Sequence, residues 1–437
     1  MSDIFEHTYC LGCNQPYNDK NPNCGLCNVV NVLIKDCADE FPDHCQIEQF
    51  DIDATKKLIL FHHIVGIKNR LKESSKNIRG LILDKNGKSV CPSLPLIEEY
   101  STKESKESKE SKESQELNLT DADVEKSNIY YDNEGAIIRV YNHDNEWQIS
   151  TNKRINAYKS KWGSDYSKTA YNDVTNIVSF GDLFDQAIAD KPNFYEALDK
   201  EFVYAFLVRN DKYSMNISPP PSSQDDKIYL IGKFTKTGEK VTDTDFTVVP
   251  KMLMLEGKDK PTTITQLLEK VKTLSLDHPG LILELGQHHR DAARFIKIYN
   301  PKYEECLSIR NGDPNLLRVY LKLRCENIAR KSEITLRRME LFKNLYEGVI
   351  FNIELIENTI TKIYQHLLEI CKFRKTQKYV CSPNFHHAWK LLQEHSGVIN
   401  ITICHNILDT RSELLLNLIN SFTTMDVTAS SLANLTI

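Results

Sequence analysis

The cysteines near the N-terminus constrain this chain more than any other sequence feature. Two Cys-x-x-Cys units, formed by Cys10 with Cys13 and by Cys24 with Cys27, are separated by ten residues. Each unit can supply two thiolates from one tight turn, and four thiolates make the closed tetrahedral ligand set of a structural Zn²⁺ ion. The spacing therefore predicts a zinc-binding module over residues 1–50, a segment too short to fold on a core of its own.

Two other interpretations of these cysteines stay open, namely a redox pair and thiols that share a spacing by coincidence. Cys37, His44 and Cys45 follow closely and could replace a ligand or pack inside the module. If cysteine fills all four positions, the metal has no open coordination site. We therefore expect a structural zinc ion and not a catalytic one.

The rest of the composition is that of a soluble protein. The 437 residues include 55 Lys+Arg and 60 Asp+Glu, which give a net charge of −5. This balance excludes a globally basic protein, so contact with nucleic acid would need a local basic patch. No apolar run approaches the ~20 residues that span a bilayer, and the N-terminal sequence MSDIFEHTYC lacks the pattern of a secretory signal. We therefore expect a cytoplasmic, intracellular protein with no membrane association.

Hydrophobic patterning divides the remaining chain into a β-rich body over residues 51–312 and a helical domain over 313–437. The pattern predicts strands near 57–66, 79–97, 128–151, 201–209, 227–232, 280–285 and 294–299, and helices at 182–199 and 262–276. From about residue 314 onward helical periodicity dominates. Lys-Glu-Ser repeats begin near residue 103, and we expect a disordered low-complexity insertion over 101–125. The fold class expected is α+β.

Five short motifs follow one another along the body. They are Arg79-Gly80 before an apolar strand, Asp132-Asn133-Glu134-Gly135, Tyr204-Ala205-Phe206-Leu207, Pro279-Gly280-Leu281-Ile282, and Lys297-Ile298-Tyr299 with Lys302-Tyr303. In order and spacing, over roughly 225 residues, they resemble the adenylyltransferase domain of phage-type RNA ligases. That family belongs to the covalent nucleotidyltransferase superfamily with DNA ligases and capping enzymes. The resemblance implies an ATP-grasp-like ligase core followed by an all-α C-terminal domain.

The chain departs from the family pattern at the positions that carry its chemistry. In the family a lysine amine attacks the α-phosphorus of ATP, but Asp132 occupies that position here. Leu207 and Pro279 stand where the family has glutamates that help hold ribose and metal. Of two lysines that neutralise phosphate charge, Lys297 is kept and Tyr299 replaces the other. A carboxylate cannot replace an amine nucleophile and repels a triphosphate, so we expect a pseudoenzyme without catalytic residues.

The resemblance thus implies an RNA-ligase-like protein that binds nucleic acid or acts as an interaction factor for a protein partner. RNA is the expected ligand, and Arg79, Lys297 and Lys302 are the candidates for phosphate contact. The segment 362–379 interleaves basic and aromatic residues, a combination that suits single-stranded nucleic acid. The same segment also reads as an ordinary amphipathic helix with a basic end.

Two other functions stay open. An active ATP-dependent RNA ligase would join 5′-phosphate and 3′-hydroxyl ends through an enzyme–AMP intermediate, with ATP and Mg²⁺. It would need another nucleophile, and Lys126, Lys153 and Lys297 are the nearby lysines. A zinc-headed structural protein would have no relation to nucleotides. Reaction with ATP distinguishes the active ligase from the pseudoenzyme, and RNA binding distinguishes the pseudoenzyme from the structural protein.

Overall fold

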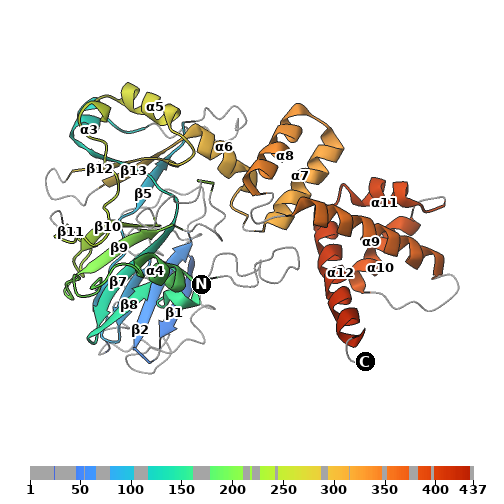
Figure 1. Ribbon diagram of the computed structural model, residues 1–437, viewed down its shortest axis with the longest axis horizontal. Helices are drawn as coiled ribbons and strands as arrows, with labels where there is room; N and C mark the ends of the chain where they lie inside the picture. The colour runs from blue at the N-terminus through green and yellow to red at the C-terminus, as the bar shows by residue number, and fades with distance from the viewer. Residues whose placement is uncertain are drawn as a thin grey trace. The chain divides into compact units, whose positions relative to one another are not determined.

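The computed structural model describes residues 24, 46–53, 55–64, 79–102, 117–160, 178–209, 217–218, 227–241, 245–286, 294–313, 315–346, 352–373, 382–394 and 398–433. The chain divides into two compact units after Glu304, within helix α6 (Pro301–Arg310). Strands make up most of the first unit, and the second is helical (Figure 1). This organisation confirms the α+β class that the hydrophobic pattern predicts.

Three sheets build the first unit (Figure 1). The first is antiparallel, with the order β1 (Gln46–Asp53), β2 (Leu58–Ile64), β3 (Leu81–Asp84), β4 (Ser89–Cys91). The second has the order β11 (Lys240–Val241), β10 (Ile228–Phe234), β9 (Val203–Val208), β7 (Ala136–His143), β8 (Glu146–Ser150). The third has the order β5 (Ile97–Tyr100), β13 (Arg294–Tyr299), β12 (Gly280–Leu285), β6 (Asn128–Tyr131), in which β5 pairs with β13 in parallel.

Strand composition explains where each sheet is buried. All six residues of β9 are buried, as expected for an uninterrupted apolar run at the centre of a sheet. Helix α4 (Phe180–Ile188) contacts β7, β9 and β10, and its Phe184 packs against Phe194 and Phe206. Helices α3 (Asp121–Lys126) and α5 (Ile264–Thr273) contribute Val124 and Leu267 to the core that covers the third sheet. Each of these helices buries its apolar side against a sheet.

The predicted helix over 182–199 is wrong in its second half. Helix α4 ends at Ile188, and the chain then turns before Pro192. Proline disfavours helical backbone in the residue before it, and Asn193 adopts a left-handed φ of 65°. Phe194 and Leu198 nevertheless reach the core, so the apolar spacing marks burial there without marking a helix.

The expected disordered insertion over 101–125 is also wrong in its last third. Residues 117–126 are ordered: Leu119 is buried, and Thr120 begins helix α3 with a capping box that Asp123 completes. This segment contains apolar residues and a cap, unlike the Lys-Glu-Ser repeats before it, and so has side chains to bury. The repeats themselves, within residues 103–116, lie outside the described residues.

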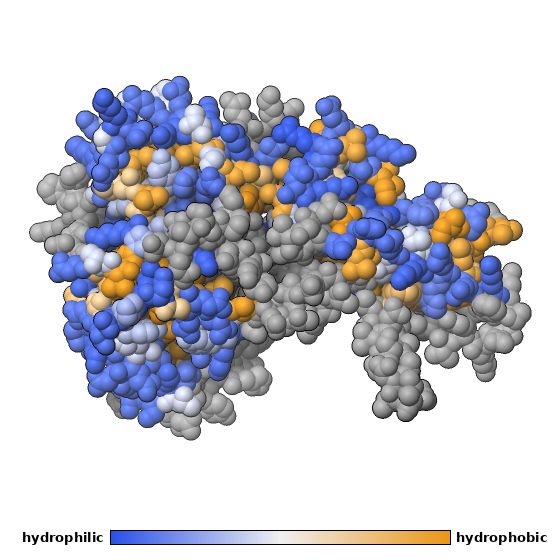
Figure 2. Space-filling model, viewed as in Figure 1, coloured by the Kyte–Doolittle hydropathy of each residue, from blue (hydrophilic) through white to orange (hydrophobic). Residues whose placement is uncertain are grey.

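The second unit confirms the helical pattern predicted from about residue 314. Its helices are α7 (Leu316–Arg330), α8 (Glu333–Tyr346), α9 (Ile353–Phe373), α10 (Pro383–Gln393), α11 (Ile401–Leu408) and α12 (Ser412–Ala433). Figure 2 shows apolar side chains at the surface of α7 and α8, where Ile328, Ile334 and Leu336 are exposed. None of the described helices is both long and apolar enough to cross a membrane.

A buried charged network ties α7, α9 and α11 together. Arg324 on α7 donates from Nε to Glu357 on α9 and from Nη1 to Asp409 at the end of α11, both at 2.7 Å. The Tyr364 hydroxyl and the His405 ring also contact the Asp409 carboxylate, at 2.5 and 2.9 Å. Arg324 and Asp409 are buried, so each needs the other to offset the cost of leaving water.

This network makes the helical unit sensitive to acid. Burial alone would raise the pKa of Asp409, but hydrogen bonds from Tyr364 and Arg324 outweigh it and hold the pKa below its ordinary value of 3.8. The stabilisation is therefore complete above pH 3.8 and is lost as the pH falls through the lower folded-state pKa. We expect Asp409→Asn to lower the free energy of unfolding at pH 7 by about 3 kcal/mol. Urea unfolding followed by helical circular dichroism measures this difference.

The same variant tests the pH dependence. Because the asparagine amide of the variant cannot titrate, the stability difference from the wild type should shrink as the pH falls from about 4 to about 2. Glu394→Gln, at an exposed position on the same unit, is the matched control and should change neither quantity. An Asp409→Asn difference that stays constant with pH would contradict this assignment.

Candidate functional site

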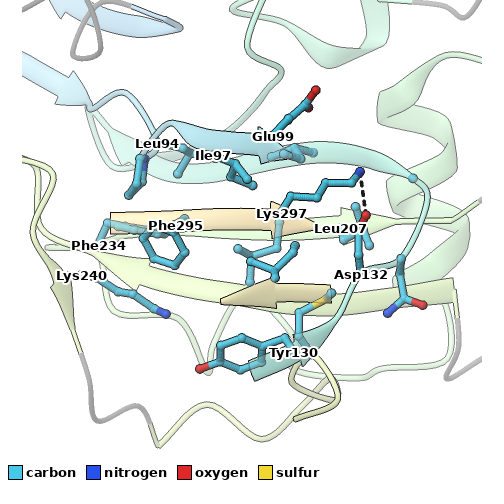
Figure 3. A pocket seen from close by; sticks show the side chains of 17 residues that line it. Leu94, Ile97, Glu99, Tyr130, Asp132, Leu207, Phe234, Lys240, Phe295 and Lys297 are labelled. Atoms are coloured by element: carbon cyan, nitrogen blue, oxygen red, sulfur yellow. Dashed lines mark ion pairs between the residues drawn. The ribbon is translucent and has the colours of Figure 1, made fainter. Parts of the chain in front are cut away.

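A cavity of about 250 Å³ lies in the first unit between the second and third sheets (Figure 3). The third sheet contributes Ile97, Glu99, Tyr130, Ile282, Phe295 and Lys297, and the second contributes Ile137, Leu207, Ile231, Phe234 and Lys240. Connecting segments add Leu94, Pro95, Asp132, Asn133, Gly135 and Met252. Most of these side chains are apolar, and the charged ones come from β5, β11, β13 and the segment after β6.

The segment 250–255 joins the two sheets that form the pocket walls. The Pro250 carbonyl accepts from the amide of Leu230 on β10 at 2.8 Å. A few residues later, the Leu253 carbonyl accepts from Tyr131 at 2.9 Å and the Leu255 amide donates to Ile129 at 2.7 Å, both on β6. One short segment is thus bonded to both sheets, and its Met252 lines the cavity. Backbone bonding therefore sets the position of one wall relative to the other.

A buried ion pair stands at one end of the pocket. Lys297 Nζ on β13 lies 2.7 Å from Asp132 Oδ2, just after β6, as the dashed line in Figure 3 marks. The two side chains are 17% and 10% exposed, so the pair is largely removed from water. The same ammonium lies 4.4 Å from the centre of the Tyr299 ring. The Asp132 amide donates to the Gly280 carbonyl at 3.0 Å, which fixes the backbone beneath the carboxylate.

Two titratable side chains beside this pair are uncharged at neutral pH. Burial, followed by the charge and hydrogen bond of Glu99, raises the pKa of Tyr299 far above its ordinary value. Burial lowers the pKa of His278 below 6.5, and its ring lies against that of Tyr131, tilted by 31° with centroids 4.4 Å apart. The Tyr299 and His278 side chains beside the ion pair therefore add no charge to it.

A second polar group occupies another part of the pocket. Lys240 Nζ lies 2.5 Å from Glu284 Oε1, and the Tyr130 hydroxyl donates to Glu284 Oε2 at 2.8 Å. Burial and the Glu284 charge raise the pKa of Tyr130 well above its ordinary value, so it stays a donor. Each of the two lysines that line the pocket thus has a carboxylate partner.

Asn133 lines the pocket with a hydrogen-bond donor that has no partner among the described residues. The residue is only 6% exposed, and its Nδ2 has no hydrogen-bond partner among the described residues. Buried amide groups are rarely left this way unless water or a ligand satisfies them. The pocket therefore presents one unused donor within an otherwise paired set of polar groups.

The structure places six of the motif positions in this one pocket, namely Asp132, Asn133, Gly135, Leu207, Ile282 and Lys297. Gly280 and Tyr299 contact the ion pair. The remaining positions lie elsewhere: Pro279 is buried before β12, Glu134 accepts from the amides of Ile217 and Ser218 at 2.7 and 2.9 Å, and Arg79 and Lys302 are exposed. The three candidate phosphate-binding residues therefore do not form one site, since Lys297 is paired inside the pocket.

Most of the predicted zinc ligands cannot be placed. Cys10, Cys13 and Cys27 lie outside the described residues, and Cys24 is buried. Cys37, His44, Cys45 and most of the basic stretch after Phe373 also fall outside that part of the chain. Within the described residues no group of three or more metal-binding side chains is found.

Sequence reasoning missed Asn133, Glu99, Tyr130 and Lys240 as lining residues. Side chains two apart on a strand share a face, which links Tyr130 to Asp132, Glu99 to Ile97, and Phe295 to Lys297. This period-two relation could have found Tyr130 once Asp132 was singled out. Asn133 and Lys240 carry no such signal, because their inclusion depends on turns and on the pairing of the sheets.

Comparison with known proteins adds little to the geometry. No protein-family model matches the chain. The immediate-early protein ICP-46 homolog of Invertebrate iridescent virus 3 is 26% identical over 256 residues, which are 56% of this chain and 52% of that protein. The match therefore spans about half the length of that relative.

Two solved ligase structures show weak similarity. An archaeal ATP-dependent RNA ligase gives a TM-score of 0.30 at 8% identity, covering 54% of this chain and 60% of the ligase. A putative ATP-dependent DNA ligase from Aquifex aeolicus gives 0.24 at 12% identity, covering 62% and 70%. At TM-scores this low, neither similarity bears on the function of this chain.

The glycines of the motifs stand where the backbone of another strand comes closest. A Cβ on Gly135 would lie 2.6 Å from the Val208 carbonyl oxygen, and one on Gly280 would lie 2.1 Å from that of Ile298. Gly80 has a left-handed φ of 82°, and its carbonyl accepts from the buried Arg139 guanidinium. These glycines are therefore required by packing, whatever chemistry the pocket performs.

We expect Gly280→Ala and Gly135→Ala each to lower the free energy of unfolding by about 1–3 kcal/mol, since the opposing strand must move. Gly286→Ala is the matched control, because nothing lies within 4 Å of its added Cβ and its φ is not left-handed. Thermal unfolding of the purified variants measures the difference. Equal stability of Gly280→Ala and Gly286→Ala would show that the strands are not this close.

Proposed function

We propose that this chain is an RNA-ligase-like protein that does not transfer nucleotide and acts by binding nucleic acid without forming a covalent intermediate. The observation that carries the proposal is the Asp132–Lys297 ion pair. Asp132 stands where the resembling family has its nucleophilic lysine, and its carboxylate holds the ammonium of Lys297 at 2.7 Å. A lysine attacks phosphorus through its nitrogen lone pair, and the Lys297 nitrogen is held in this ion pair instead.

The geometry disfavours an active ligase that uses another lysine. The two lysines that line the pocket, Lys240 and Lys297, are each held by a carboxylate. Lys126 and Lys153 are exposed and do not line the pocket. The pocket wall has Leu207 where the family has a metal- or ribose-binding glutamate, so Mg²⁺ and ribose would lose a ligand there.

We expect no covalent AMP on the protein. Incubation with ATP and Mg²⁺, followed by intact mass measurement under denaturing conditions, should give an unchanged mass. An ATP-dependent ligase treated in parallel is the positive control and should gain the mass of one AMP. An adduct on this chain would overturn the proposal, and peptide digestion would then identify the nucleophile.

The same measurement under native conditions tests the proposed zinc module. We propose that Cys10, Cys13, Cys24 and Cys27 hold one structural Zn²⁺ ion, on the strength of their spacing. The native mass should exceed the denatured mass by one zinc ion. Cys10→Ser should lose that ion, whereas Cys371→Ser, a partly buried thiol in the helical unit, should keep it. A zinc-free native protein would contradict the module.

We propose RNA as the nucleic acid, and the exposed basic residues Arg79 and Lys302 as phosphate contacts. Arg79→Ala and Lys302→Ala should each weaken RNA binding several-fold. Each should also make the plot of log affinity against log salt concentration less steep by about 0.7, the value per phosphate contact for single strands. Fluorescence anisotropy with labelled single-stranded RNA between about 50 and 200 mM salt measures both effects. Lys200→Ala, another exposed lysine of the first unit, is the control. Absence of salt-dependent binding in the wild type would favour the purely structural alternative.

A further inference from the structure

We infer that the pocket between the second and third sheets binds an uncharged planar heterocycle, such as a free nucleobase or a nucleoside, in preference to a phosphorylated nucleotide. This inference rests on the proposed function, under which the pocket forms no covalent adenylate. Three features of the pocket support it: the aromatic side chains in its walls, the unused donor of Asn133 and the compensation of its charges.

The walls suit a flat ligand. They come from the facing surfaces of two sheets, whose inward side chains leave a cavity between them. Phe234 and Phe295 line this cavity with aliphatic neighbours such as Leu94 and Ile97 (Figure 3). Aromatic side chains bind flat rings through offset stacking and edge contacts. The cavity volume of about 250 Å³ is slightly below the ~300 Å³ at which ordinary small-molecule sites begin. A ligand that fits this volume is a ring system with few substituents.

Asn133 gives the ligand a polar edge. Its amide lines the pocket, is nine-tenths buried and leaves Nδ2 without a partner among the described residues. A ligand with a hydrogen-bond acceptor on the rim of its ring would satisfy this donor. A purely apolar ligand would leave it buried and unsatisfied, which costs affinity.

The charges of the lining residues explain the preference against phosphate. Lys297 is paired with Asp132 and Lys240 with Glu284, so no described lining cation is left for a phosphate group. Glu99, the remaining charged lining residue, is an exposed carboxylate that repels an anion. A triphosphate would therefore gain no compensated contact and would meet one unfavourable charge, whereas a nucleoside avoids both costs.

The test compares adenosine with ATP on the full-length protein by isothermal titration calorimetry. We expect the dissociation constant of adenosine to be at least about tenfold lower than that of ATP. Asn133→Ala should weaken adenosine binding by about tenfold. Asn344→Ala, at an exposed asparagine of the helical unit, is the matched control. Tighter or equal binding of ATP, or no binding of adenosine at about 1 mM, would overturn the inference.

A second variant, Asp132→Asn, is expected to strengthen the binding of ATP, whereas Asn133→Ala weakens the binding of adenosine. Asp132→Asn removes the partner of Lys297 and should raise the affinity for ATP about tenfold relative to the affinity for adenosine. If ATP affinity does not rise relative to adenosine, the charge compensation is not the cause of selectivity and the inference fails. Intact mass of the titrated wild-type protein separates the two proposals, because a covalent AMP adduct would overturn the proposed function itself.

Discussion

The Asp132–Lys297 ion pair is the interaction on which the character of the pocket depends. The pair spans β12, since Asp132 follows β6 on one side of that strand and Lys297 lies on β13 on the other. Either charge alone would be costly at this burial, because the penalty of leaving water is several kcal/mol per ion. The carboxylate and the ammonium are therefore interdependent. A pocket with this pair has a polar end without a net charge, which differs from the cationic cradle that a triphosphate needs.

The strand scaffold around the pair follows from ordinary packing constraints. Gly135 and Gly280 stand where a carbonyl of the next strand leaves no room for a Cβ, and Gly80 supplies a left-handed turn against Arg139. Arg139 is fully buried, and its Nη2 donates to the Thr151 carbonyl at 2.7 Å. It thereby links the turn before β3 to the end of β8. Packing alone therefore requires glycine at these motif positions.

How much the sequence predicts depends on whether a feature is local. The strands β12 and β13 were predictable, because apolar runs act within a few positions. The end of α4 was mispredicted because Phe194 and Leu198 keep a helical spacing while Pro192 breaks the helix. Pocket membership was only partly predictable. Asp132 and Lys297 were singled out by resemblance, but their ion pair depends on which strands flank β12, and that order is a tertiary property.

The compensation of charge in the pocket has a consequence for how its function can change. At both polar groups a lysine is matched by a carboxylate, so a single substitution leaves an unpaired buried charge and loses stability together with specificity. A lysine at position 132 would place two ammonium groups where one carboxylate now balances one ammonium. A bound anion or a second substitution would relieve that repulsion. Changing either residue of the ion pair alone therefore costs stability, so the two positions can change without that cost only together.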